Sequence, residues 1–564
     1  VANFSGDLNI GYGLKYRISY GADLSFWGAD GYTPLYYLSG NNRATLTNAH
    51  QSSNRGTVWQ IENVVTWDRQ FGKHSVNAVL GQSAMQNTGM NLYGSLQNLK
   101  DINKPYMNNT NADRSRGEMS ASGGPAYKHT LSSYFFRASY NYGERYMAQV
   151  TVRRDGSSRF GANNRYATFP SFSLGWNVIN EPYFKAPKWL SALKVRGSWG
   201  KNGNDNIGDF TYAAWTASPY NTVWGRGENV VNGVQAGALS NPDLKWEESI
   251  QTDLGLDLGF FDNALTFSVD WFKKKTSGMI ISMPIPNYVG SEAPLGNVGD
   301  MENKGVEFNL NFIPVQTKDW NLTVGFNGTF QHTEFTKLNN TDDPDYNIQT
   351  GSITKGTGNL LQIHKVGYAP YTFYCFQQVY DQDGNPIQNA LVDRDKDGKI
   401  TQADRYVTDK SPNPDFFYGI SLKLSYKNWD FGFNGHGSAG NWVFNDFASA
   451  NSTSNIDINA GNLPNFARLV KKTGFTKANS GEQWYSDMFL ENASFFRMDD
   501  INLGYTFNKI GNWKGSMRVA FGVQNVFVIT DYSGVDPEIP GVNGIDGSIW
   551  PRPRTYSLRL NVNF

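Results

Sequence analysis

The chain has 564 residues, with 50 Lys or Arg and 50 Asp or Glu residues, so its formal net charge at pH 7 is zero. Recognition of nucleic-acid phosphates requires a surplus of basic side chains, so this balance argues against a nucleic-acid-binding protein. The single cysteine, Cys375, excludes an intrachain disulfide framework and a cysteine-based zinc site. Aromatic residues make up 15% of the chain and charged residues only 18%, against about 25% charged in a typical soluble protein. This composition indicates a surface that does not lie entirely in water.

No segment reaches the roughly 18 consecutive apolar residues that a membrane-spanning helix needs. Apolar and polar residues alternate instead along many segments; in one of them Leu265, Phe267 and Val269 share one face. Such alternation predicts β-strands with one apolar and one polar face. About seventeen strands are predicted in chain order, near residues 3–12, 15–28, 57–71, 74–92, 130–142, 146–159, 168–180, 190–203, 249–260, 264–278, 303–315, 320–335, 416–426, 429–440, 495–508, 514–529 and 553–564.

The connections between these strands are sorted by length. Short turns such as Gly72–Lys73 and Lys427–Asn428 alternate with long insertions at residues 204–248, 336–415 and 441–494. Tight periplasmic turns and long extracellular loops are typical of an outer-membrane β-barrel, whereas a soluble β-sandwich has no reason to sort its loops in this way. The predicted fold class is therefore all-β, a transmembrane antiparallel β-barrel in the outer membrane of a Gram-negative cell.

The last predicted strand ends the chain with the residues TYSLRLNVNF. Its alternate residues from Tyr556 to Phe564 are apolar or aromatic and share one face. A last strand that ends in an aromatic residue resembles the segment that the assembly machinery of the outer membrane recognises in barrels generally. The alternative is an ordinary amphipathic strand that happens to finish the chain.

Several segments carry a more specific resemblance. They are LKVRGSWGKNGND at 193–205, NPDLKWEESIQTDLGLDLGFFDNALTFSVDWFKKKTSGMI at 241–280, GNVGDMENKGVEFNLNF at 296–312, VDRDKDGKITQADRY at 392–406, and TDYSGVDPEIPGVNG followed by PRPRTYSLRLNVNF near the end. With them the whole chain resembles the SusC/RagA family of TonB-dependent outer-membrane transporters from Bacteroidetes. The resemblance implies import of oligosaccharides or peptides, energised by the inner-membrane proton-motive force through TonB, with a SusD-like surface lipoprotein as partner.

Two other functions stay open beside this one. A siderophore or cobalamin receptor of the wider TonB-dependent group would share the barrel, but it is not expected to carry the NPDLKWE and NKGVE segments. A passive porin would lack a plug and usually has fewer strands. Within the favoured class, the sequence leaves open whether the substrate is a glycan or a peptide.

Members of the resembled family have 22-stranded barrels with a plugged lumen. They normally begin with a small β-sandwich extension, a TonB box and a plug domain, and no segment of this sequence resembles these parts. We therefore expect residues 1–564 to be the C-terminal portion of a barrel, with about five strands, the plug and the TonB contact outside this sequence. Counting back from a last strand that ends in the periplasm, the first strand runs inward, which places Val1 in an extracellular loop.

One motif carries explicit ligand chemistry. In DRDKDGKITQAD, carboxylates stand at positions 1, 3, 5 and 12, glycine at position 6 and a backbone carbonyl at position 7, which is the layout of a Ca²⁺-binding loop. The corresponding residues are Asp393, Asp395, Asp397, Lys399 and Asp404. An aspartate replaces the usual glutamate at the last position, which shortens its reach. The motif predicts a structural Ca²⁺ that cross-links a long loop, and the alternative is a solvated turn rich in Asp and Gly.

Aromatic residues in the predicted loops are the candidates for binding a carbohydrate substrate by stacking. They are Trp215, Tyr220, Trp224, Trp442 and Trp484. The alternative is that they form small hydrophobic cores of the loops themselves.

Tryptophans beside turns or near strand ends are predicted to form the aromatic girdle at the lipid interface. They are Trp59, Trp67, Trp271, Trp320, Trp429 and Trp513. The lysine run 273–275 follows a predicted lipid-facing strand and is interpreted as a charge run exposed to solvent or in contact with lipopolysaccharide.

Enzymatic motifs are missing from the sequence. The six histidines show no metal-ligand spacing, and the patterns G-x-S-x-G, H-E-x-x-H and a phosphate-binding glycine loop do not occur. The chain is therefore predicted not to be an enzyme, although a site spread over several strands would leave no local motif.

Overall fold

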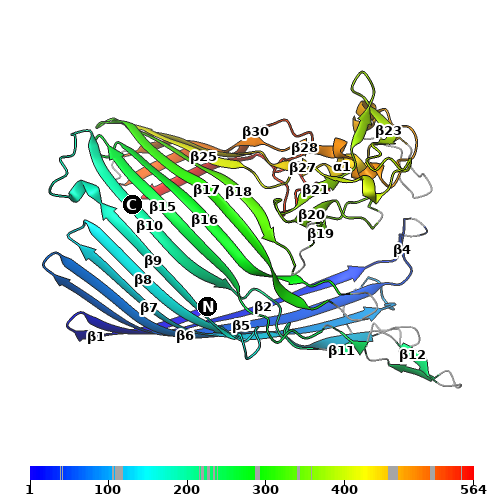
Figure 1. Ribbon diagram of the computed structural model, residues 1–564, viewed down its shortest axis with the longest axis horizontal. Helices are drawn as coiled ribbons and strands as arrows, with labels where there is room; N and C mark the ends of the chain where they lie inside the picture. The colour runs from blue at the N-terminus through cyan, green and yellow to red at the C-terminus, as the bar shows by residue number, and fades with distance from the viewer. Residues whose placement is uncertain are drawn as a thin grey trace.

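Seventeen long strands joined in one antiparallel sheet dominate the computed structural model (Figure 1). The structure describes residues 1–38, 40, 42–103, 107, 119–214, 216–217, 221–224, 229–232, 235–237, 239–285, 293–339, 343, 345–356, 358–454, 468–508, 515–547 and 549–563. The strands of the large sheet are β1 Ala2–Gly11, β2 Leu14–Thr33, β5 Asn48–Phe71, β6 His74–Gln97, β7 Met119–Tyr142, β8 Tyr146–Ser157, β9 Tyr166–Asn177, β10 Leu190–Asn204, β15 Glu247–Phe260, β16 Leu265–Ser282, β17 Leu295–Gln316, β18 Trp320–Lys337, β25 Phe416–Tyr426, β26 Trp429–Ala439, β29 Phe495–Phe507, β30 Ser516–Thr530 and β31 Thr555–Asn563.

Each of these strands pairs with its neighbours along the chain, from the β1–β2 pair to the β30–β31 pair. The predicted all-β antiparallel fold and the seventeen predicted strands are confirmed. Several strands are longer than predicted; β6, for example, continues to Gln97. Alternation fades in these extensions, where isolated apolar residues such as Ala49 and Leu96 form a small local core instead of a continuous apolar face. No helix among the described residues is long and apolar enough to cross a membrane.

The sheet has two edges, because no pairing between β1 and β31 occurs in the described part of the chain. β1 runs toward the short turns, as expected from the strand count. Val1 precedes Ala2, however, and Ala2 pairs with Ala22 in the middle of β2. The expectation that Val1 lies in a loop is therefore wrong, since Val1 lies level with the middle of its neighbouring strand (Figure 1).

Short turns lie at one end of the sheet and long loops at the other, as Figure 1 shows at its left and right sides. Gly72 and Lys427 each open a two-residue turn with positive φ (57° and 52°), the backbone that tight hairpins require. At the opposite end, residues 338–415, 440–494 and 531–554 form long connections between neighbouring strands. The sheet therefore has a turn end and a loop end.

The two faces of the sheet differ as the alternation predicts. At the turn end of the apolar face, Trp320, Tyr426, Trp429 and Tyr505 lie opposite one another on β18, β25, β26 and β29. Ring centroids are 4.1 Å apart for Trp320 and Tyr426 and 4.8 Å apart for Trp429 and Tyr505. Two tryptophans of the predicted girdle, Trp320 and Trp429, belong to this aromatic row, and Trp513 and Phe564 lie outside the described residues.

The connections carry short elements of their own. The strands are β3 Tyr36–Tyr37, β4 Arg43–Ala44, β11 Thr216–Ala217, β12 Asn221–Trp224, β13 Asn229–Asn232, β14 Gln235–Ala236, β19 Asn347–Thr350, β20 Gln362–Lys365, β21 Thr372–Cys375, β22 Gln378–Tyr380, β23 Pro386–Leu391, β24 Tyr406–Val407, β27 Trp442–Phe444 and β28 Leu490–Asn492. The helices are η2 Val178–Asn180, η4 Gln402–Asp404, α1 Asp446–Ala450, α2 Arg468–Thr473, η6 Gln483–Tyr485 and η7 Asp487–Phe489.

Candidate functional site

The connections after β18, β26 and β30 pack against one another in a loop assembly at the loop end of the sheet (Figure 1). Its core contains Ile353, Leu361, Phe373, Cys375, Phe376, Leu391, Phe444, Ala448, Tyr485, Phe489 and Leu490, with Ile545 packed against it. Each of the three connections contributes to this one core. The burial of its large aromatic side chains, each worth roughly 1.5–3 kcal/mol, explains why such long connections are ordered.

A buried polar network joins the first two of these connections. The Gln378 carboxamide oxygen accepts hydrogen bonds from Gln483 at 2.7 Å and from the Ser486 hydroxyl at 2.9 Å. Asp487 accepts one from the Gln378 backbone N–H at 2.9 Å and one from the Tyr406 hydroxyl at 2.7 Å. Buried polar groups need such partners, because an unsatisfied one costs about 1–3 kcal/mol. The network therefore specifies how these two connections meet.

The predicted metal-binding motif forms a tight loop on this assembly. Asp393, Asp395 and Asp397 offer carboxylate oxygens that all lie within 4.8 Å of one another. Asp393 accepts backbone N–H groups from Lys396 at 2.7 Å and from Gly398 at 2.8 Å, and Gly398 has φ of +84°. Three clustered carboxylates are a donor set that suits a hard cation such as Ca²⁺. The first three predicted ligands are thus brought together.

The last predicted ligand, Asp404, has a different position. Its side chain is buried and accepts backbone N–H groups from Arg394 at 2.6 Å and from Thr401 at 2.8 Å, in a capping box that begins η4. It does not belong to the group of three carboxylates in the described structure. Lys399 donates its backbone N–H to Asp397 at 2.8 Å. Asp404 therefore stabilises the backbone of the loop by hydrogen bonds and is not a member of the clustered carboxylates.

The electrostatics of the motif follow from these contacts. The backbone N–H of Asp397 lowers the pKa of Asp395, but desolvation and the negative charges of Asp397 and Asp404 outweigh it, so the pKa of Asp395 lies above its ordinary value. The Thr401 backbone N–H, followed by those of Arg394 and Asp395, holds the pKa of Asp404 below its ordinary value. The carboxylate group thus carries repulsion that a bound cation would relieve, whereas Asp404 is already satisfied.

Arg405 anchors this motif to the loop assembly. Its guanidinium is nearly fully buried and donates to the Tyr374 carbonyl at 3.1 Å and to the Gln402 side chain at 3.1 Å. It lies over the Tyr374 ring at 4.1 Å and the Tyr485 ring at 5.6 Å. Burial lowers the pKa of Arg405. Carbonyl oxygens and aromatic faces compensate this buried cation, an arrangement that the planar arginine fork permits.

Of the aromatic residues predicted to bind substrate, some lie outside the described residues and two pack within the loop assembly. Trp215, Tyr220 and the side chain of Trp224 lie outside the described residues. Trp442 and Trp484 are half-buried and pack against the core of the loop assembly, and the Lys410 ammonium lies 3.7 Å from the Trp442 ring centre. The alternative of a core role for these two residues has direct support here, and their contact with substrate stays a prediction.

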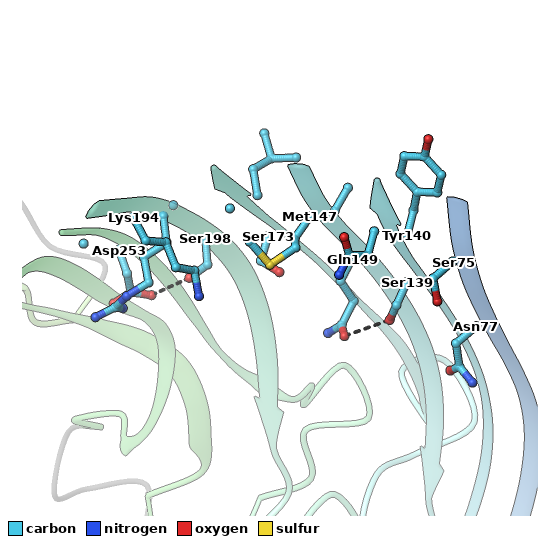
Figure 2. Close-up of a pocket in the computed structure, with 17 residues that line it drawn as sticks. Ser75, Asn77, Ser139, Tyr140, Met147, Gln149, Ser173, Lys194, Ser198 and Asp253 are labelled. Carbon is cyan, nitrogen blue, oxygen red and sulfur yellow. Dashed lines mark hydrogen bonds between the residues drawn. The ribbon is translucent and has the colours of Figure 1, made fainter. Parts of the chain in front are cut away.

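The polar face of the sheet contains a cavity of about 390 Å³ near the turn end. Figure 2 shows Ser139 and Gln149, joined by a 3.1 Å hydrogen bond, on one side of the strands, with Tyr140 turned to the other side. Farther along the cavity, Ser198 donates to Asp253 at 2.8 Å, and Lys194 lies close by. Such a surface offers hydrogen-bond donors and acceptors to polar groups.

Ion pairs across strands of the polar face were not found from sequence. Arg196 on β10 contacts Asp257 at 3.1 Å and Asp270 on β16 at 2.6 Å. Arg518 on β30 donates to Asp430 on β26 at 2.8 Å. The signal in the sequence is a charged residue at a polar-face position of a strand, and that signal does not show which residue on another strand it pairs with.

The chain is similar in sequence to known outer-membrane receptors. Residues 2–526 match the family described as "TonB dependent receptor-like, beta-barrel". The chain is 40% identical over 451 residues to TonB-dependent receptor SusC of Bacteroides thetaiotaomicron, covering 78% of this chain and 44% of that protein. It is 28% identical to TonB-dependent receptor P3 of Formosa agariphila, covering 100% of this chain and 58% of that protein. The chain thus spans about half the length of these curated relatives.

A solved structure shares the fold. The structure described as that of the RagAB peptide transporter aligns with a TM-score of 0.82 at 24% identity, covering 100% of this chain and 61% of that chain. Its agreement extends over the whole seventeen-stranded sheet. From the family match and this fold, the chain belongs to the TonB-dependent receptor-like β-barrel family of the outer membrane.

Proposed function

We propose that this chain supplies the barrel wall and the loop assembly of a transporter that imports oligosaccharides or peptides across the outer membrane. The transporter would be energised through TonB and would work with a SusD-like surface lipoprotein. The observation that supports this proposal most directly is one wide sheet with a polar, hydrogen-bonding face and an interlocked loop assembly at its loop end. The 40% identity to a TonB-dependent receptor of the SusC type supports the same assignment.

The parts have distinct roles in this proposal. The lipoprotein and the loop assembly capture substrate at the loop end, and TonB acts on the plug of the transporter. Polar side chains such as Gln149 and Ser198 offer hydrogen bonds to a hydrated substrate that moves along the polar face. The apolar face contacts membrane lipid.

We propose transport without catalysis. Of the histidines, His436 has the most charged surroundings, and both of its ring nitrogens face carboxylates, Asp499 at 2.7 Å and Glu538 at 3.1 Å. Neither nitrogen is therefore available to activate a nucleophile. The curated relatives are receptors, which agrees with this assignment.

Two measurements test the transport proposal. Affinity purification of the whole transporter from outer membranes should recover a surface lipoprotein in constant ratio. A deletion strain should lose growth on one class of polymer fragment, glycan or peptide, and regain it when the gene is restored. Recovery of the protein alone, together with unchanged growth on every glycan and peptide source, would exclude the proposal.

We also propose that Asp393, Asp395 and Asp397 hold a structural Ca²⁺, because their carboxylates are clustered and mutually repulsive. Bound Ca²⁺ would stabilise the loop assembly by neutralising this charge. Terbium luminescence on the purified transporter should report one displaceable Ca²⁺ site, and Asp395→Asn should weaken binding about ten- to hundredfold. Asp383→Asn, in a nearby exposed turn, is the matched control and should leave binding unchanged. Equal loss in both variants, or no luminescence, would exclude the site.

A further inference from the structure

The apolar face changes character abruptly at one cross-strand row near the loop end. Trp271, Val306 and Phe330 lie opposite one another on β16, β17 and β18. Two residues farther toward the loop end, on the same face of the same three strands, Lys273, Lys304 and His332 again lie opposite one another. Lys275 follows on β16. We call Lys273, Lys275, Lys304 and His332 the basic belt.

The position of the belt matches the edge of the hydrocarbon layer. On β18 the apolar-face positions run from Trp320 in the aromatic row to Phe330, which is ten residues along one strand. At about 3.3 Å per residue and a tilt of about 40°, ten residues span roughly 25 Å of membrane thickness, the height of the apolar band of an outer-membrane barrel. His332 therefore lies one step beyond that band, at the level of lipid headgroups.

Acidic partners hold the belt without covering it. Glu302 contacts Lys273 at 3.0 Å and Lys304 at 3.7 Å, and Asp300 contacts Lys275 at 3.5 Å. Glu334 contacts both Lys304 and His332 at 3.8 Å. The carboxylate side chains are 16–27% exposed, whereas the basic side chains are 47–60% exposed. The negative charges thus lie against the sheet and the positive charges form the outermost layer.

This layering has an energetic reason. Like charges directly opposite each other, as Lys273 and Lys304 are, destabilise a sheet unless something compensates them. The recessed carboxylates compensate the lysines, and an ammonium group with three donors keeps some of them for an outside acceptor. In a membrane, lipid headgroups supply acceptors at this height on the apolar face.

We propose that the basic belt binds the phosphate groups of lipopolysaccharide in the outer leaflet. Long loops leave this end of the sheet and the turns leave the other, so the belt faces the outer leaflet of the membrane. This proposal depends on the outer-membrane location of the protein and does not depend on which substrate it transports. A failed uptake assay would therefore count against the proposed transport, and a failed lipid-binding assay would count only against the basic belt.

The chain contains its own matched control. Lys274 lies between Lys273 and Lys275, and the period-two alternation of β16 turns it to the polar face, where it lies opposite Asn303. Lys273→Gln combined with Lys304→Gln removes charge from the belt. Lys274→Gln removes the same kind of charge from the other face of the same strand.

The test measures binding of fluorescent lipopolysaccharide to the whole transporter purified in detergent. A lysine near an anionic lipid surface contributes about a factor of five to affinity, so the double variant should bind about 25-fold more weakly. Lys274→Gln and the doubly conservative Lys273→Arg/Lys304→Arg should bind as the parent protein does. Dephosphorylated lipopolysaccharide should bind the parent about as weakly as the intact lipid binds the double variant.

Several outcomes would overturn the proposal. They are unchanged binding by the double variant, equal loss in Lys274→Gln, and equal binding of the dephosphorylated lipid. Weaker binding of phosphatidylglycerol alone, with lipopolysaccharide binding unchanged, would also overturn it. Heat-modifiable migration in gels confirms that each variant is a folded barrel before its binding is compared.

Discussion

The Arg497 guanidinium on β29 lies 2.6 Å from the Asp536 carboxylate in the connection between β30 and β31, and both side chains are about 95% buried. A second bond at 2.5 Å joins Arg497 to Glu538. This pair fastens the 531–554 connection to the polar face of the sheet. It also brings residues 39 positions apart in sequence into direct contact.

Breaking this pair should release the connection. Arg497→Ala removes the buried cationic partner of Asp536 and leaves the half-exposed Arg552, at 3.4 Å, as the remaining one. Removing one member of a buried ion pair typically costs about 3–5 kcal/mol, and the remaining contact with Arg552 places the expected cost at the lower end. We expect a lower free energy of unfolding and early proteolytic cleavage within residues 531–554. The control is Lys365→Ala, because Lys365 pairs at 3.1 Å with Asp345, whose side chain is 89% exposed. That change should cost less than about 1 kcal/mol, and equal costs for the two variants would contradict the assignment.

Arg405 should be irreplaceable by lysine. A lysine cannot donate to the Tyr374 carbonyl and the Gln402 side chain at once in the planar arrangement of the guanidinium. Loss of charged hydrogen bonds in this buried position should cost about 2–3 kcal/mol, measured by denaturant unfolding of the loop assembly. Arg394→Lys is the matched change on the exposed side, where a 4.8 Å contact with the Tyr406 ring is lost, and it should be nearly neutral.

The acidic motif should respond to pH in two opposite ways. The folded pKa of Asp404 is lowered, so its stabilising contribution is present above its ordinary value of 3.8 and is lost as the pH falls through the folded pKa. The folded pKa of Asp395 is raised, so protonation favours the folded motif at low pH, and this contribution is lost as the pH rises past 3.8 through the folded pKa.

Two variants separate these effects in thermal unfolding with and without Ca²⁺. Asp404→Asn should lower the Tm at pH 7 in either condition, because backbone donors lose a charged acceptor. Asp395→Asn should maintain or raise the Tm in chelator, where repulsion is relieved, and should need about ten- to hundredfold more Ca²⁺ for the same gain in Tm. An unchanged Ca²⁺ dependence of the Tm in Asp395→Asn would contradict the proposed site.

Alanine substitutions at the two glycines of the β1–β2 turn, Gly11 and Gly13, should destabilise the turn by different amounts. Gly11 and Gly13 both have positive φ, +92° and +81°, so alanine at either position carries a left-handed penalty of about 1–2 kcal/mol. A Cβ at Gly13 would also lie 2.0 Å from the Asp68 carbonyl oxygen, whereas a Cβ at Gly11 meets nothing within 4 Å. Gly13→Ala should therefore destabilise the turn more than Gly11→Ala, as measured by amide hydrogen exchange across β1 and β2.

Local pattern was sufficient for the strands and their faces. Period-two alternation identified every strand of the large sheet, because a half-buried strand repeats its chemistry every second residue wherever it pairs. It also placed Trp320 and Trp429 on the apolar face, since that assignment depends only on parity. The Asp-rich motif was found because its three clustered carboxylates lie within five consecutive residues.

Contacts between distant residues could not be read from such patterns. Asp404 fits the motif by spacing, yet its oxygens are taken by the backbone N–H groups of Arg394 and Thr401, and only the folded loop shows this. Trp442 and Trp484 were proposed to face substrate, and they pack against the core of the loop assembly. No property of a single loop determines which other loop covers it.

The sequence alone therefore determined the fold class, the strands, their lipid-facing side and the family, because each depends on side-chain alternation or on contiguous motifs. Only the tertiary structure decided the interlocking of the long connections, the Arg497–Asp536 fastening and the alignment of Lys273, Lys304 and His332 in one row. Those features depend on register between strands and on packing between loops. Both arise from the free energy of contacts between segments that are far apart in the chain.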